Sequence, residues 1–339
     1  MDTLLDLVWL FLGFLLLAKG AHWLVDGGAS LARKWGVSPL MVGLTVVAWG
    51  TSMPELMIVS LTASGGDPAS SLNTVIGSNV ANIGLVLGSS ALILPTILRG
   101  RIAAREAAWL FGSLGLMWAV CWNGVVTRGE AGLLLGAFVV HNWVLFRSAK
   151  ADKARAAEAI EEISEHAEHT TDYIPTRPWT NVIIGSISIA GGAKLVIMGG
   201  QELAALMGVP PAFIALSVYA FGTSLPELAA GIGSALKGHA DISIGNVIGS
   251  NVFNVLAVIG VAGLIAPLNG VVAGETTKTM TDVLTVHLPA ALVFSIALVA
   301  LPLLGKGGGR VKAAILVGAY LSYMIWQGLS SVAGPGVSP

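Results

Sequence analysis

The sequence predicts an all-α polytopic membrane protein with ten transmembrane helices arranged as two inverted five-helix repeats. Three observations support this prediction: the composition, a series of long apolar segments, and an internal repeat. Of the 339 residues, 55% are hydrophobic and only 11% are charged. An ordinary soluble domain carries roughly a quarter charged residues. Too few charges remain to coat a water-facing surface of this size, so a soluble enzyme is not expected.

Ten segments of the chain are long and apolar enough to cross a membrane. A spanning helix needs about 20 predominantly apolar residues. The predicted spans are 4–25, 38–63, 71–96, 105–122, 130–147, 179–199, 211–236, 242–267, 283–304 and 312–330.

A polar segment, 148–178, separates a first five-helix half (1–147) from a second (179–339). If the N-terminus lies outside, most Lys and Arg residues fall in inside loops, and the outside loops hold only Arg128 and Lys278. The positive-inside rule then places both termini outside and the 148–178 linker in the cytoplasm.

Other functional classes lack their sequence signals. The net charge of −1 gives no basic excess for nucleic acid. No phosphate-binding G-x-x-x-x-G-K-[ST] motif is present, so ATP is not an expected partner. The single cysteine, Cys121, excludes an intrachain disulfide and a cysteine-built metal cage. We expect membrane lipid as a partner, no cofactor, and no need for an oligomer.

The internal repeat is the most informative feature. Residues 36–56 (GVSPLMVGLTVVAWGTSMPEL) match 208–228 (GVPPAFIALSVYAFGTSLPEL), and 75–82 (VIGSNVAN) match 247–254 (VIGSNVFN). Both pairs share an offset of 172 residues. The copies begin in the second and seventh predicted spans, so they cross the membrane in opposite directions. Inverted repeats are typical of secondary transporters, which bind substrate near the midplane where the repeats meet.

Each copy carries a glutamate within an apolar span, Glu55 and Glu227. An ionised carboxylate in the bilayer interior costs several kcal/mol unless it is paired or binds a metal ion. These glutamates therefore predict an ion-binding site. The structural alternative is a protonated glutamate or one paired with Lys19 or Lys194.

The residues around each glutamate supply further oxygen atoms. Gly50 and Pro54 predict a broken helix that leaves backbone carbonyls free, and such carbonyls at membrane depth line a site or cavity. With no thiolate and no histidine in either repeat core, oxygen ligands favour Na⁺, Ca²⁺ or Mg²⁺, and two carboxylates with a flexible oxygen shell favour Ca²⁺. The predicted ligands are the carboxylates of Glu55 and Glu227, carbonyls near Ala48, Thr51, Ala220 and Thr223, hydroxyls of Ser52, Ser78, Ser224 and Ser250, and amides of Asn79, Asn82, Asn251 and Asn254.

The motifs GTSMPEL with VIGSNVANIGLVLG, and GTSLPEL with NVIGSNVFNVLAVIG, resemble the two alpha-repeats of the calcium/cation antiporter superfamily, in particular its prokaryotic sodium/calcium exchanger branch. The resemblance spans essentially the whole chain. It implies secondary antiport by alternating access in a prokaryotic plasma (inner) membrane, with Na⁺ entry driving Ca²⁺ extrusion.

The resemblance also implies roles for individual residues. Glu55 and Glu227 would bind Ca²⁺ together with the carbonyls of Thr51 and Thr223. Spans 1 and 6 would slide as a gating pair against the other eight. The implied Na⁺ ligands are Ser52, Ser78, Ser224, Ser250 and the carbonyls of Ala48 and Ala220.

The chain departs from that branch at two places. Both copies carry asparagine, Asn82 and Asn254, where the branch commonly has one acidic residue. The first copy also has Asn73 where the second has Gly245, which predicts looser helix packing beside the site. Antiport of H⁺ for Ca²⁺, or of another divalent cation, remains the alternative function. A passive cation channel ranks below both because the repeat is inverted.

Overall fold

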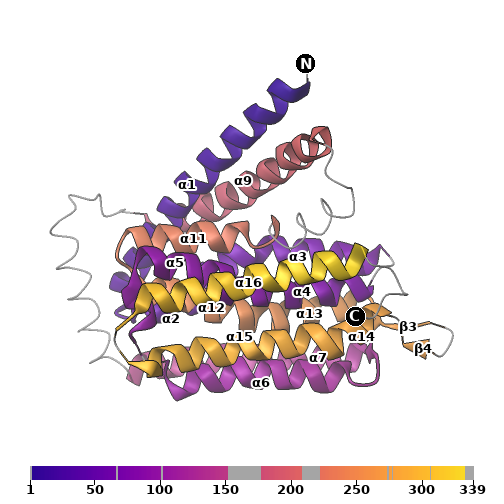
Figure 1. Cartoon of the computed structure of the whole chain (residues 1–339). Helices are drawn as coiled ribbons and strands as arrows, with labels where there is room; N and C mark the ends of the chain where they lie inside the picture. Colours follow the sequence, from indigo (N-terminus) through magenta and orange to yellow (C-terminus); the bar gives the residue numbers. More distant parts are fainter. Residues whose placement is uncertain are drawn as a thin grey trace.

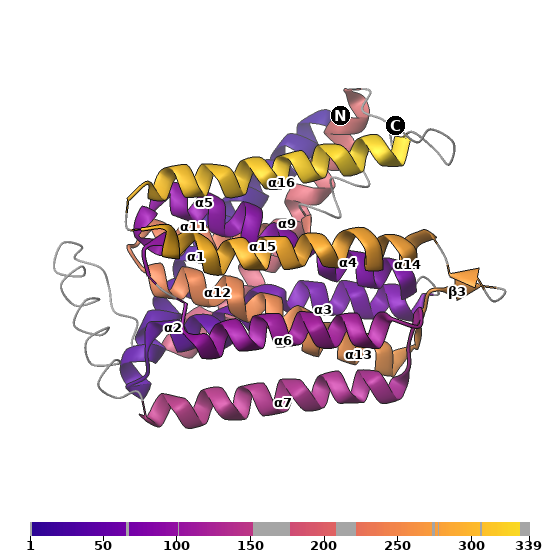
Figure 2. The ribbon, with the colours of Figure 1, turned by 60° about the horizontal axis from the view of Figure 1, so that its bottom comes forward.

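Helices account for nearly all of the described residues, as the apolar segments predict. The computed structural model describes residues 2–65, 68–100, 102–151, 177–207, 222–272, 275–276, 278–305 and 307–332. The predicted linker 148–178 lies almost wholly outside these ranges, and so does the beginning of the predicted span 211–236. Figures 1 and 2 show a bundle of roughly parallel helices from which α1 and α9 project together.

The first half contains five predominantly α-helical stretches, two of which are interrupted by a π-helical turn. Its helices are α1 (Asp2–Trp35), α2 (Pro39–Val42), η1 (Gly43–Val47, π), α3 (Ala48–Ser64), α4 (Pro68–Ala81), η2 (Asn82–Leu87, π), α5 (Gly88–Ile93), η3 (Pro95–Leu98, 3₁₀), α6 (Ala104–Cys121) and α7 (Arg128–Ala151).

The second half repeats this order where it is described. Its helices are α9 (Pro178–Leu206), α11 (Leu225–Leu236), α12 (Ala240–Phe253), η4 (Asn254–Val258, π), α13 (Ile259–Ile265), α14 (Lys278–Asp282), η5 (Val283–His287, π), α15 (Leu288–Ala300), η6 (Leu301–Leu304, 3₁₀) and α16 (Gly309–Val332).

Four two-residue strands lie in loops between the helices. Strand β1 (Val125–Val126) pairs antiparallel with β2 (Leu268–Asn269), and β3 (Val271–Val272) pairs antiparallel with β4 (Glu275–Thr276). The first pair ties the loop after α6 to the end of the span that contains α13. These strands were not predicted, and they leave the all-α class unchanged.

Eight helices in the described part of the chain are long and apolar enough to cross a membrane. They correspond in order to eight of the ten predicted spans. The other two predicted spans coincide with α6, which begins with the charged pair Arg105 and Glu106, and with α11, which is described for only twelve residues. The protein is therefore a polytopic membrane protein, and the count of ten spans is not confirmed.

Two predicted span ends are wrong. Helix α1 continues to Trp35 rather than ending at 25, and α9 continues to Leu206 rather than ending at 199. The apolar run in α1 stops near Asp26, but the helix does not. Asp26 pairs with His22 one turn earlier and with Lys237 of α11, so its charge is accommodated.

Helices α1 and α9 pack antiparallel along a seam of glycines (Figures 1 and 2). A Cβ atom added at Gly13 would lie 2.8 Å from the Gly192 carbonyl oxygen, and one added at Gly27 would lie 2.8 Å from the Pro178 carbonyl oxygen. Only glycine allows two backbones to come this close. Because α1 and α9 are the first helices of the two halves, their antiparallel packing is the arrangement expected for copies of opposite orientation.

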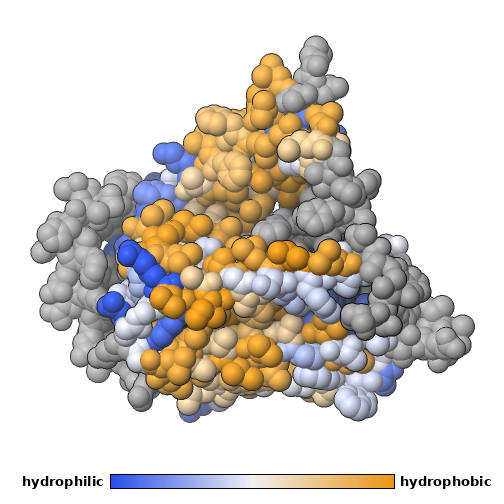
Figure 3. Space-filling view, viewed as in Figure 1, coloured by the Kyte–Doolittle hydropathy of each residue, from blue (hydrophilic) through white to orange (hydrophobic). Residues whose placement is uncertain are grey.

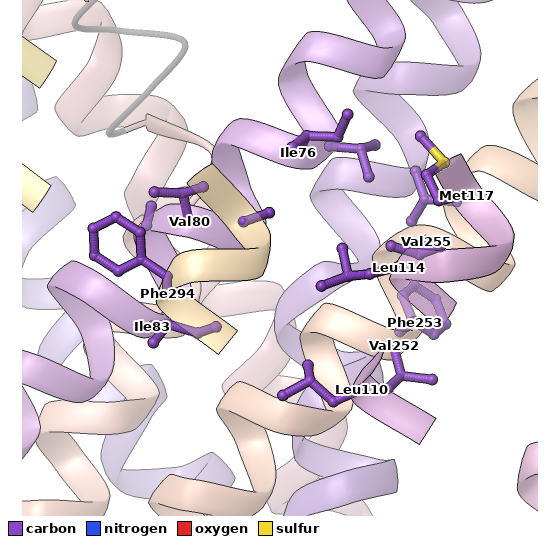
Figure 4. Close-up of a cluster of buried hydrophobic side chains, with 14 of the residues drawn as sticks. Ile76, Val80, Ile83, Leu110, Leu114, Met117, Val252, Phe253, Val255 and Phe294 are labelled. Carbon is purple, nitrogen blue, oxygen red and sulfur yellow. The ribbon is translucent and has the colours of Figure 1, made fainter. Parts of the chain in front are cut away.

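The main apolar core lies between helices of both halves (Figure 4). The members labelled in Figure 4 come from α4, α6, α12 and α15 and from the π-helical turns η2 and η4, so the two halves share one core. Its labelled members in Figure 4 are Ile76, Val80, Ile83, Leu110, Leu114, Met117, Val252, Phe253, Val255 and Phe294.

The outer surface is apolar, which is the reverse of a soluble protein. Figure 3 shows hydrophobic residues covering the projecting α1–α9 pair and much of the visible bundle. Phe11 on α1, Ile187 on α9 and Ile325 on α16 are each more than 60% exposed. Such surface is stable against lipid tails, so the protein is an integral membrane protein. The orientation of its termini stays a prediction.

Candidate ion-binding site

The two predicted glutamates lie in the interior of the bundle. Glu55 is on α3 and Glu227 is on α11, and both side chains are fully buried. Helices α4 and α12, which carry the repeated serines and asparagines, pack against them. The structure therefore brings the two repeat motifs to one place.

The predicted helix break is absent from the first copy. Helix α3 continues through Pro54 to Ser64. A proline removes one backbone hydrogen bond, here to the Gly50 carbonyl, and a helix can tolerate that loss with a local bend. The Ala48 carbonyl is not free either, since it accepts a hydrogen bond from the Thr51 hydroxyl at 3.1 Å.

In the second copy the backbone is interrupted. Thr223 and Ser224 form a turn, and α11 begins at Leu225 with Pro226 in its first turn. Glu227 therefore lies at the positively polarised N-terminal end of a helix, where a carboxylate is stabilised. The predicted ligand Ala220 lies outside the described residues.

A π-helical turn begins at the equivalent asparagine of each copy, at Asn82 in η2 and at Asn254 in η4. A third π-helical turn, η1, ends directly before Ala48. Such turns widen the helix by one residue and occur frequently at functional sites.

Serine hydroxyls contact both carboxylates and link the two halves. Ser52 of α3 donates to Glu227 Oε1 at 2.7 Å, and Ser78 of α4 contacts Glu55 Oε1 at 3.4 Å. Ser78 Oγ also lies 3.2 Å from Ser224 Oγ, so the Ser52–Glu227 and Ser78–Ser224 contacts both cross between the halves.

The four asparagines of the repeat form a reciprocal network. Asn79 Nδ2 donates to the Asn251 backbone oxygen at 3.2 Å, and Asn251 Nδ2 donates to the Asn79 backbone oxygen at 3.3 Å. Asn82 Nδ2 donates to Asn251 Oδ1 at 3.1 Å, and Asn254 Nδ2 donates to Asn79 Oδ1 at 3.2 Å. Each of these four contacts has its mate under exchange of the two copies, as a local two-fold axis requires.

Four buried oxygen atoms in this cluster have no hydrogen-bond donor among the described residues: Oε2 of Glu55, Oε2 of Glu227, Oδ1 of Asn82 and Oδ1 of Asn254. They form two symmetry-related pairs. Leaving a buried acceptor unpaired costs about 1–3 kcal/mol, and more when it is charged. Cations can satisfy buried acceptors of this kind, and carboxylate and amide oxygen atoms suit Na⁺ and Ca²⁺.

The donor set is not a soft-metal site. In the part of the chain that the structure describes, no three His, Cys, Asp or Glu side chains are grouped to hold a metal ion. Lys19 and Lys194 are exposed on α1 and α9, and within the described ranges neither glutamate forms an ion pair. The alternative of a lysine-paired structural glutamate therefore has no support.

The remaining predicted residues also lie in this interior. Ala48, Thr51 and Ser250 are fully buried, and Thr223 is nearly so. Sequence reasoning missed Asn246 of α12, whose Oδ1 lies 3.1 Å from Thr51 Oγ1. Its position one helical turn before Ser250, on the same face of α12, was the available signal.

Gly245 of the second copy packs closely against another helix, whereas the looser packing expected at Asn73 of the first copy stays a prediction. A Cβ atom at Gly245 would lie 2.6 Å from the Leu40 carbonyl oxygen and 3.0 Å from the Gly43 Cα atom. Glycine thus lets α12 approach α2 and η1 closely.

Comparison with known proteins agrees with this geometry. The family model described as "Sodium/calcium exchanger protein" matches residues 5–147 and 178–329. The chain is 30% identical to the sodium/calcium exchanger MaX1 of Methanosarcina acetivorans, covering 93% of this chain and 96% of that protein. It is 32% identical to the inner membrane protein YrbG of Escherichia coli, covering 76% of this chain and 79% of that protein.

Solved structures of the sodium-calcium exchanger NCX_Mj have a similar fold. One, soaked with Na⁺ and Ca²⁺, superimposes with a TM-score of 0.74 at 25% identity, covering 95% of this chain and 98% of that chain. The match therefore extends over both halves. From its sequence and its fold, the chain belongs to the sodium/calcium exchanger protein family.

Proposed function

We propose that this protein is a secondary antiporter that exchanges Na⁺ for Ca²⁺ across the membrane by alternating access, with the ions bound between Glu55 and Glu227. Members of its family are transporters rather than enzymes. Na⁺ and Ca²⁺ would be substrates of the transport cycle and not resident cofactors. The names of MaX1 and NCX_Mj support this pair of ions.

The observation that carries the proposal is the set of four unpartnered oxygens around two buried glutamates. Two carboxylates balance the charge of one Ca²⁺, which accepts a flexible shell of 6–8 oxygens. In this proposal Glu55 and Glu227 bind Ca²⁺ with the carbonyls of Thr51 and Thr223. The flanking Na⁺ ligands are Ser52, Ser78, Ser224, Ser250 and the carbonyls of Ala48 and Ala220, and the amides of Asn82 and Asn254 complete the shell.

Sharing the glutamates couples the two fluxes. Na⁺ and Ca²⁺ cannot both neutralise the same carboxylates, so binding of one favours release of the other. The empty site would carry two uncompensated charges in the bilayer interior, which disfavours crossing without an ion. Each ion shifts the balance between inward and outward states only by its difference in affinity for them.

Protons are the competing coupling ion, because a proton can also neutralise a buried carboxylate. Asn82 and Asn254 are neutral, so the buried carboxylates in this cluster are Glu55 and Glu227. The H⁺/Ca²⁺ alternative would use the same two residues.

The test is uptake of radioactive Ca²⁺ into proteoliposomes of the full chain. Vesicles loaded with NaCl are diluted into Na⁺-free or Na⁺-matched buffer at constant pH, and a second set is given a pH gradient with Na⁺ absent. We expect uptake only with the outward Na⁺ gradient. Uptake driven by the pH gradient would support the H⁺/Ca²⁺ alternative. Uptake without any counter-ion gradient would indicate a passive channel.

A further inference from the structure

One position breaks the symmetry of the site. Asn246 of α12 and Thr74 of α4 are equivalent under the 172-residue offset, yet they differ in length and in hydrogen-bonding capacity. After them the copies agree closely, with Ser78 matching Ser250 and Asn82 matching Asn254. The difference therefore lies next to residues that the proposed exchange uses.

Asn246 contacts the first copy through a single buried hydroxyl. Its side chain is fully buried, and its Oδ1 lies 3.1 Å from Thr51 Oγ1. The same Thr51 hydroxyl lies 3.1 Å from the Ala48 carbonyl oxygen and 3.5 Å from Ser250 Oγ. Thr51 thus joins Asn246 to two proposed Na⁺ ligands.

The single hydroxyl proton of Thr51 decides the orientation of the Asn246 amide. Thr51 has one hydroxyl proton, so it cannot donate to the Ala48 carbonyl and to Asn246 Oδ1 at once. In this orientation of the amide, Asn246 Nδ2 is also buried without a partner among the described residues. Turning the amide over by 180° removes the conflict, because Nδ2 then donates to Thr51 Oγ1 while Thr51 donates to Ala48. It also leaves the Asn246 oxygen as a free buried acceptor.

We propose that Asn246 is a positioning residue that holds the Thr51 hydroxyl on the Ala48 carbonyl and makes the Na⁺ subsite formed by Ala48 and Ser250 tighter than its counterpart in the other copy. The counterpart has the shorter Thr74 in place of the amide. The two Na⁺ subsites are therefore unequal, although the residues assigned as their ligands match. This inference rests on the proposed exchange.

The test exchanges the two residues between the copies. Asn246→Thr gives the second copy the residue of the first, Thr74→Asn does the reverse, and the double variant exchanges them. Each protein is titrated with NaCl, with choline chloride holding the ionic strength constant. Two quantities are read: the Na⁺ concentration that half-saturates exchange, and the Na⁺-dependent rise in melting temperature of the detergent-solubilised protein.

We expect Asn246→Thr to raise the half-saturating Na⁺ concentration by about three- to tenfold, as for the loss of one hydrogen bond, with the maximal rate unchanged. Thr74→Asn should lower it, and the double variant should return toward the wild type. Shifts of both single variants in the same direction, or a lower maximal rate with unchanged Na⁺ dependence, would overturn the inference. If Asn246→Thr does not fold, Thr74→Asn still decides, because unchanged Na⁺ dependence in that variant is incompatible with it.

The two readouts separate this inference from the proposed function. Absence of Na⁺-driven Ca²⁺ uptake in the wild type would contradict the exchange itself. Na⁺-dependent stabilisation measures binding alone, so it reports the role of Asn246 whatever the coupled ion is.

Discussion

The two copies of the repeat place similar side chains on different backbones. In the first copy Glu55 lies in the middle of a continuous helix that runs through Pro54, whereas in the second Glu227 lies in the first turn of α11, after the turn at Thr223 and Ser224. The asparagines of α4 and α12, by contrast, pair reciprocally. The comparison teaches that the ligand set keeps the two-fold symmetry while the backbone that carries it does not.

The largest effect should come from removing either glutamate. Glu55→Gln and Glu227→Gln each take one charge from opposite a buried cation, a loss of about 3–5 kcal/mol that corresponds to at least a 100-fold reduction in exchange. If the symmetry of the ligands governs transport, both variants lose Na⁺-driven Ca²⁺ uptake equally.

Glu202→Gln is the matched control, since Glu202 is exposed on α9 and should tolerate the change. Uptake retained by one glutamate variant and lost by the other would show that the backbone difference matters more than the shared ligands. Retention by both would contradict the site.

Asn254→Asp and Asn82→Asp test the reciprocal network. Each variant replaces an amide donor by a carboxylate oxygen that faces the Oδ1 of Asn79 or Asn251. An acceptor opposite an acceptor should destabilise the ion-free protein by about 1–3 kcal/mol. Because the added charge binds cations, the melting temperature should also rise more steeply with Na⁺ or Ca²⁺ than in the wild type.

The two aspartate variants should behave alike, because their contacts with Asn79 and Asn251 are equivalent under exchange of the copies. Melting curves in ion-free buffer and in graded Na⁺ or Ca²⁺ provide the measurement. A fall in stability for only one variant would show that the network is not reciprocal.

The sequence predicts a residue of this site when the internal repeat marks that residue in both copies. Glu55 and Glu227 stand out as the carboxylates shared by two apolar repeats, and the offset of 172 pairs their neighbours directly. Asn246 escaped prediction because Thr74 replaces it in the other copy, so the repeat does not mark it.

Backbone features were harder to predict. Pro54 and Pro226 occupy equivalent positions, yet only the second copy is interrupted, because packing around α3 tolerates the lost hydrogen bond. The π-helical turns that begin at Asn82 and Asn254 have no residue signature that separates them from a regular α-helix. The ends of α1 and α9 were missed because apolar periodicity marks the membrane part of a helix and not its full length.

The glycine seam between α1 and α9 offers a smaller and symmetric test. Gly20 and Gly192 are equivalent, and a Cβ atom would lie 2.8 Å from the Gly185 carbonyl oxygen in one case and 2.7 Å from the Gly13 carbonyl oxygen in the other. Alanine at either position should force the helices apart, costing about 1–3 kcal/mol of stability as overpacking does.

Gly191→Ala is the control, because a Cβ atom there meets open space in the described structure. The melting temperature of each variant, measured in the same detergent, should fall for Gly20→Ala and Gly192→Ala and stay unchanged for Gly191→Ala. Alanine has a higher helix propensity than glycine, so equal losses in all three would show that the close approach does not govern this pair.

The smallest effect concerns the ion pair between Asp26 of α1 and Lys237 at the end of α11. Its equivalent positions in the other copy are Met198 and Gly65, so this link joins the α1–α9 pair to the bundle at one end only. The two side chains are 18% and 16% exposed, and water screens such a pair, so Asp26→Asn should cost only about 0.2–1 kcal/mol.

Charge reversal in the double variant Asp26→Lys/Lys237→Asp should restore most of the lost melting temperature, whereas either reversal alone should lower it. Failure of the double variant to recover would mean that Lys237 acts mainly through its contact with the His22 carbonyl, 3.2 Å away, and that the asymmetry at this end is one of packing rather than of charge.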